Sequence, residues 1–187
     1  MSERRLKGEL DLPPLPDLLA PGLRVIFIGF NPGETSARTG RYYGYAGNRF
    51  WWLLWQAGLT DRLVAPAEDY TLPERYGLGL TDLVDRPSKS SGDLAGWELR
   101  EGREALLAKL RSYRPRVACY NGKGVYAAAA GVKQVAYGLQ PASLVDGVLD
   151  YVTASPSGRS RETLAVKLEL YRELKRLADS VTEETRE

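Results

Sequence analysis

The stretch from Leu23 to Thr60, LRVIFIGFNPGETSARTGRYYGYAGNRFWWLLWQAGLT, decides the fold. Val25 to Ile28 form a continuous run of β-branched and aromatic residues, which predicts a strand covered on both faces in a parallel sheet. A Gly-Phe-Asn-Pro-Gly loop, a group of aromatic residues and a Trp-rich helix follow. Asn31 is therefore expected just past the carboxyl end of a strand, where open α/β sheets bind ligands. This order of elements predicts a pocket for a flat ring.

Apolar runs and helical periods alternate along the remainder of the chain. Asn48 is a candidate N-cap for the Trp-rich helix, and Gly58 is expected to end it. The alternation predicts the fold class α/β, as a single three-layer α/β/α domain with a short, mostly parallel central sheet. Further strands are expected near residues 79–84, 116–120, 135–139 and 148–154, and further helices near 94–113, 124–130 and 161–178.

Length and composition fit one compact domain. With 187 residues and 43% hydrophobic content, the chain can bury a substantial core without disulfides or metal. We expect a Pro-rich lead-in over residues 1–22, the folded domain over residues 23–178 and an acidic tail over residues 179–187, which holds four acids and one base. The formal net charge is only +2, so a basic face for nucleic acid is possible but composition alone does not demand one.

Several classes of chemistry are excluded by the residue types present. The chain has no histidine, so no imidazole serves as general acid, general base or metal ligand. Cys119 is the only cysteine, which rules out a four-cysteine iron–sulfur cluster, and its place in an apolar strand indicates a structural thiol. We therefore expect no metal and no cofactor. No apolar stretch is long enough to span a membrane and the N-terminus lacks a signal-peptide core, so we expect a cytoplasmic protein.

Two ordered motifs carry a specific resemblance. GFNPGETSARTGRYYGYAGNRFW, from Gly29 to Trp51, resembles the first motif of the mismatch-specific uracil-DNA glycosylase and thymine-DNA glycosylase family. TASPSGRSR, from Thr153 to Arg161, resembles its second motif, and LTDLVDRP, from Leu80 to Pro87, resembles its middle segment. The similarity extends from Leu19 to about Leu177. It implies a monomeric, monofunctional DNA glycosylase of base excision repair that acts on double-stranded DNA containing uracil or mismatches.

Cleavage of a base from deoxyribose requires water beneath C1′ and hydrogen-bond donors on the departing base. Asn31 matches the family's water-positioning asparagine, and its carbonyl can hold a water without titrating. The alternative is that Asn31 only forms an Asx turn before Pro32.

An acidic candidate follows the polar loop 87–92. Asp93 can activate water better than an amide can, and it is equally suited to be the N-cap of the helix expected from Leu94. Asp82 and Asp85 lie in or beside a strand and are interpreted as structural.

The resemblance also implies a base pocket. The backbone N–H groups of Phe30 and Tyr43 would donate to uracil carbonyls, and the Tyr43 ring would stack on the extruded base. Ser36 corresponds to a pocket serine of the family, and the alternative is a simple loop hydroxyl. For Tyr43 the alternative is a role in packing. Ser155 is the largest departure, because the family that the motifs resemble has asparagine there, and it leaves the catalytic contribution of the second motif open.

The second motif is expected to enter DNA. Gly158 and Ser160 would offer main-chain contacts to the guanine left without its partner, while Arg159 replaces the family's wedge leucine. Arg161 either clamps a phosphate or begins the last helix, and Lys89 either contacts phosphate or is a solvated loop residue. For Arg159 the alternative is an ordinary exposed arginine.

Two other functions stay open from the residues alone. Ser155 makes a non-catalytic lesion-binding module credible. A nucleotide-binding α/β hydrolase would also use a strand, a glycine loop and a helix, but the loop lacks GxGxxG and GxxxxGK[ST], and Pro32 removes a donor from it.

Overall fold

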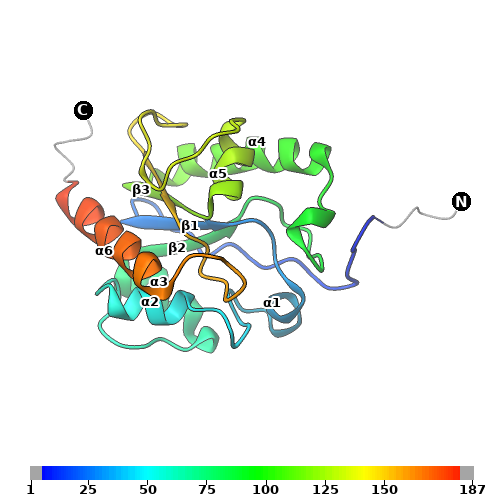
Figure 1. The fold of residues 1–187 in the computed structure, drawn as a ribbon, viewed down its shortest axis with the longest axis horizontal. Coiled ribbons are helices and arrows are strands. Elements are labelled where there is room, and N and C mark those ends of the chain that lie inside the picture. The colour runs from blue at the N-terminus through cyan, green and yellow to red at the C-terminus, as the bar shows by residue number, and fades with distance from the viewer. Residues whose placement is uncertain (1–5, 182–187) are drawn as a thin grey trace, which may run out of the picture.

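A five-stranded sheet organises the computed structural model, which describes residues 6–181. The strand order is β2-β1-β3-β5-β4 (Figure 1). β4 pairs antiparallel with β5 and the other pairings are parallel, so the predicted α/β fold with a mostly parallel sheet is confirmed. The strands are β1 (Val25–Gly29), β2 (Leu78–Asp82), β3 (Val117–Asn121), β4 (Gly138–Leu139) and β5 (Leu149–Thr153).

Helices cover both faces of this sheet (Figure 1). Because successive side chains of a strand point to opposite faces, Val25 and Phe27 of β1 join one apolar cluster while Ile26 and Ile28 join the other. The first cluster packs under α2 (Phe50–Gln56), α3 (Leu72–Tyr76) and α6 (Leu164–Ser180). The second packs under α4 (Gly96–Tyr113) and α5 (Lys123–Ala130). Because helices bury both faces of the sheet, the strands appear in the sequence as continuous apolar runs.

Three helix starts differ from the sequence prediction. Arg49, not Asn48, is the N-cap of α2, although the Asn48 side chain accepts a hydrogen bond from the Phe50 N–H at 2.9 Å. α4 begins at Gly96 because Glu98 accepts the Ala95 N–H at 2.8 Å. α6 begins at Leu164, where the Thr163 hydroxyl accepts the Val166 N–H at 3.3 Å. The short helix α1 (Glu34–Thr39) and α3 were not predicted.

The described part of the lead-in packs on the sheet. Leu18 and Leu80 exchange two backbone hydrogen bonds of 2.9 Å, which extend the free edge of β2. Residues 182–187 of the acidic tail and residues 1–5 lie outside the described residues. Over residues 6–181, no helix combines the length and apolar character that crossing a bilayer requires.

Candidate functional site

A cavity of about 420 Å³ opens at the carboxyl ends of the parallel strands. Its wall combines the loop after β1, the end of β2, the end of β3 and the loop after β5, so the two sequence motifs converge on one space. This volume is in the range of small-molecule pockets. The predicted site residues that line it are Phe30, Asn31, Ser36, Tyr43, Lys89, Ser155 and Arg159.

The Asn31 side chain is held in one orientation. Its Nδ2 donates to Ser88 Oγ at 2.7 Å and to the Arg86 carbonyl at 2.9 Å, which assigns the other amide atom as the oxygen. No group within residues 6–181 donates a hydrogen bond to that oxygen, so the Asx turn considered as the alternative is not formed. The amide therefore offers an oriented acceptor to the cavity.

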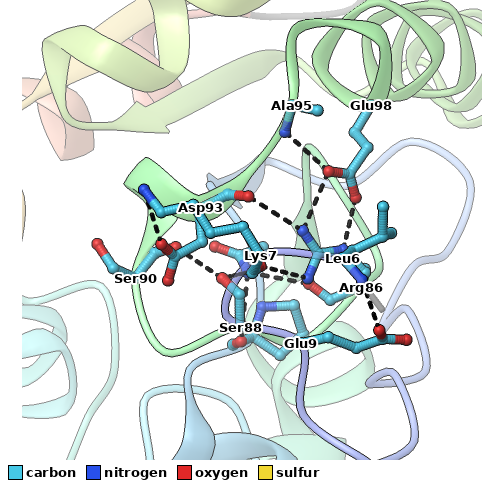
Figure 2. A network of polar contacts seen from close by, with 11 residues as sticks. Leu6, Lys7, Glu9, Arg86, Ser88, Ser90, Asp93, Ala95 and Glu98 are labelled. Atoms are coloured by element: carbon cyan, nitrogen blue, oxygen red, sulfur yellow. Dashed lines mark hydrogen bonds and ion pairs between the residues drawn. The ribbon is translucent and has the colours of Figure 1, made fainter. Parts of the chain in front are cut away.

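Ser88 is a site residue that the sequence analysis missed. It is 1% exposed, its hydroxyl donates to the Ser90 carbonyl at 2.7 Å, and its N–H donates to the Pro32 carbonyl at 3.1 Å. The loop that carries it is fixed by Arg86, whose Nε and Nη2 donate to the two Glu98 oxygens at 2.6 and 3.0 Å (Figure 2). The hydrogen bond from Arg86 lowers the pKa of Glu98, which keeps this buried ion pair charged.

The backbone of Tyr43 is strained, and its ring is supported by a neighbouring aromatic ring. Its φ of 50° is in the left-handed region, which non-glycine residues rarely adopt. The exceptions are concentrated at functional sites. Phe50 stacks on its ring at 3.9 Å between centroids and 24° between planes, while the ring also lines the cavity. The Ser36 hydroxyl accepts the Gly44 N–H at 3.3 Å and so fixes the adjoining peptide.

A buried polar network holds the Tyr43 hydroxyl. Asn121 Nδ2 donates to this hydroxyl at 2.6 Å. Asn121 Oδ1 in turn accepts from the hydroxyls of Thr153 at 3.0 Å and Tyr171 at 3.1 Å, so the orientation of the Asn121 amide is fixed by both its ends. Burial raises the pKa of Tyr43, which keeps the phenol neutral.

The second-motif loop is joined to the first motif. The Pro156 carbonyl accepts the Arg49 N–H at 2.9 Å. Gly158 lies so close to Gly47 that a Cβ on it would be 2.9 Å from the Gly47 carbonyl oxygen. The buried Lys167 of α6 donates to the Ser157 carbonyl at 2.7 Å. The loop therefore rests on the segment before α2 and faces the same cavity as Asn31.

Most of the chain matches a known protein family. The family model described as the Uracil DNA glycosylase superfamily matches residues 16–175. The chain belongs to the uracil-DNA glycosylase superfamily. Membership in this superfamily indicates a DNA glycosylase of base excision repair, a hydrolase that acts on N-glycosidic bonds, so a nucleotide-binding hydrolase is no longer favoured.

The residues that the sequence predicts to contact DNA occupy different places around the cavity. Arg159 and Lys89 are exposed cations at its wall, and neither side chain forms an ion pair within the part of the chain that the structure describes. Gly158, Ser160 and Arg161 do not line it. Arg161 is exposed in the turn before α6, so it does not begin that helix.

Asp93 lies outside the cavity wall. It ends the short 3₁₀ turn Ser91–Asp93, and it is not the N-cap of α4. Its carboxylate pairs with Lys7 Nζ at 3.3 Å (Figure 2). The same carboxylate packs against Gly8. The Asp93 carboxylate is therefore paired with Lys7 and does not line the cavity that holds Asn31.

Two further titratable side chains differ in location, since Asp82 lies at the cavity and Cys119 lies in the core. Asp82, interpreted as structural from the sequence, is a cavity-lining residue. Cys119 is fully buried, and burial raises the pKa of its thiol, which suits a structural role. No group of three or more metal-ligating side chains occurs within residues 6–181.

Proposed function

We propose that this chain is a monofunctional, mismatch-directed uracil-DNA glycosylase. It removes uracil opposite guanine from double-stranded DNA as a monomer, needs no cofactor, and accepts thymine or modified cytosine as further substrates. The observation that carries the proposal is the oriented Asn31 carbonyl, which faces the same cavity as an aromatic ring backed by Phe50.

The chemistry follows from the placement of these groups. The flipped base would stack on Tyr43, while the backbone N–H groups of Phe30 and Tyr43 donate to its carbonyl oxygens. Neither N–H is bonded to another group in the described chain. A single such donor is worth about 3 kcal/mol of transition-state stabilisation. Water held by the Asn31 carbonyl would then attack C1′ as the base departs.

A preference for mismatches would arise even if the protein does not recognise the DNA base sequence. Extruding a base costs least where its pairing is already poor, which favours guanine–uracil over adenine–uracil. The Arg159 side chain, exposed above the cavity, would fill the gap that the flipped base leaves.

The proposal is tested with labelled DNA that carries one uracil, as a G:U duplex, an A:U duplex and a single strand. We expect alkali-labile abasic sites to form in the uracil-containing DNA, and to form fastest in the G:U duplex. The competing function, a non-catalytic lesion-binding module, predicts normal binding of the G:U duplex with no abasic sites above background.

Arg159→Ala is expected to lower excision from a G:U duplex by on the order of 10-fold to 100-fold, because unstacking costs a few kcal/mol that the wedge offsets. Excision from single-stranded DNA, which needs no wedge, should change little. Arg111→Ala is the matched control, because this exposed arginine lies in the last turn of α4 and does not line the cavity. Equal losses on duplex and single strand would show that Arg159 is not a wedge.

Asp93→Asn is expected to reduce the single-turnover rate at least about tenfold, since general base catalysis is typically worth 10²–10⁴-fold and Asn31 retains part of the water site. Lys7→Met is the control, because it breaks the same ion pair and leaves the carboxylate. The pair is easily opened, as the Lys7 side chain is 76% exposed. If both variants excise at the wild-type rate, Asp93 has only a structural role.

A further inference from the structure

Asp82 is a nearly buried carboxyl group with no partner in the cavity. It ends β2, in register with Gly29 at the end of β1, and it is 8% exposed. Its carboxyl occupies the space beside Gly29: a Cβ on that glycine would lie 2.3 Å from Asp82 Oδ1 and 3.6 Å from the Tyr43 hydroxyl. Within residues 6–181, no group forms a hydrogen bond or ion pair with this carboxyl.

The charges around Asp82 favour its neutral form. Lys109 is the nearby cation, but its Nζ pairs with Asp17 at 2.7 Å and with Asp85 at 3.7 Å. Burial raises the pKa of Asp82 to about 8, with Asp17 and Asp85 adding to the rise and Lys109 opposing it. The neighbouring Tyr42 and Tyr43 contribute no charge, because burial raises the pKa of both phenols. These surroundings favour the protonated carboxyl at neutral pH.

A neutral carboxylic acid and a carboxylate have opposite effects on a departing base. The acid has an O–H that donates a hydrogen bond, whereas the carboxylate only accepts. Negative charge develops on the base as the glycosidic bond breaks, so an ionised Asp82 would repel it in a site of low dielectric constant. The Tyr43 hydroxyl already accepts a hydrogen bond from Asn121, and no hydrogen bond joins it to Asp82.

We propose, on the basis of the function proposed above, that Asp82 is a catalytic residue which, as a neutral carboxylic acid, donates a hydrogen bond to an oxygen of the flipped base as that base departs. The C1′–N1 bond breaks and its electron pair stays on the base. A water oxygen bonds to C1′ and loses one proton, first to Asp93 as general base and then to solvent, and the base anion takes one proton from solvent. Asp82 keeps its own proton throughout, so one water is consumed and the acid is unchanged.

The test is the pH dependence of single-turnover excision from a G:U duplex, from about pH 6 to about pH 10, with duplex binding measured at each pH. The wild-type rate should fall above pH 8, where Asp82 ionises. Asp82→Asn keeps a donor that does not titrate, so its rate should lack this fall and stay within about tenfold of wild type at neutral pH. Asp82→Ala should lose on the order of 10²–10³-fold at every pH below the fall.

Two outcomes would overturn the assignment. One is an Asp82→Asn variant that keeps the wild-type fall at high pH, and the other is an Asp82→Ala variant that folds normally and excises at the wild-type rate. If Asp82→Ala does not fold, the near-isosteric Asp82→Asn variant still decides the question through its pH profile. A wild-type protein that releases no base at any pH would instead refute the proposed function, so the two failures are distinguishable.

Discussion

Asn31→Ala is expected to lower the single-turnover rate of uracil excision by on the order of 10²–10³-fold, while affinity for the G:U duplex stays within about twofold. The Asn31 oxygen is the oriented acceptor for water, and its amide nitrogen is already bonded to Ser88 and to the Arg86 carbonyl. Truncation therefore removes the water site and leaves the aromatic platform in place. The measurement is the rate of abasic-site formation with protein in excess over DNA.

Ser88 provides a graded control for this prediction. Ser88→Ala removes one of the two short hydrogen bonds that orient Asn31, so its loss should be intermediate, roughly tenfold. Ser88→Thr retains the hydroxyl and should recover most of the rate. A wild-type rate for Asn31→Ala would remove the water-positioning role altogether.

Asn121→Ala is expected to lower the free energy of unfolding by roughly 3–5 kcal/mol, because it removes three hydrogen bonds from a buried network. The hydroxyls of Tyr43 and Tyr171 lose their bonds to Asn121, and Thr153 keeps only a longer one of 3.4 Å to the Tyr120 carbonyl. Thr153 and Tyr171 are fully buried, and each donates to Asn121 Oδ1. Tyr43 loses the hydrogen bond to its hydroxyl, so base stacking should weaken as well. Urea unfolding followed by tryptophan fluorescence measures the stability change.

Ser180→Ala is the matched control, since its exposed hydroxyl donates only to the Leu177 carbonyl at the end of α6. We expect a change below about 0.5 kcal/mol for this variant. If Asn121→Ala were no more destabilising than Ser180→Ala, the buried network would not be a stabilising element.

The sheet could be predicted from the sequence because its strands are buried on both faces. Runs such as Val25 to Ile28 show this directly, and the alternation with helical periods then restricts the architecture. Helix α1 could not be predicted in the same way, because only Ala37 among its six residues is buried and no apolar period marks it. The starts of α4 and α6 depend on backbone N–H groups that donate to the Glu98 and Thr163 side chains. For α4, the nearby Asp93 was an equally suitable N-cap by sequence.

The site was predictable only where the motifs named a position. Asn31, Tyr43, Ser155 and Arg159 were expected near one another, and the structure places all four on the cavity wall. The supporting residues depend on contacts between distant segments. Ser88 meets Asn31, and Asn121 meets Tyr43, across long stretches of chain.

The role proposed for Asp82 could not be predicted from the sequence. Its raised pKa depends on burial and on Asp17, an acid that the lead-in brings near the end of β2. Neither effect follows from the position of Asp82 in a strand, which is why the sequence indicated only a structural role.

We propose that two loops and the ends of parallel strands form a site that hydrolyses the N-glycosidic bond between uracil and deoxyribose in DNA. The most direct measurement is chromatographic detection of free uracil from a G:U duplex, alongside the integrity of the uracil-bearing strand. We expect one free uracil for each abasic site formed, with the strand intact until alkali is added. Tight binding of the duplex with no free uracil, from a correctly folded protein, would contradict it.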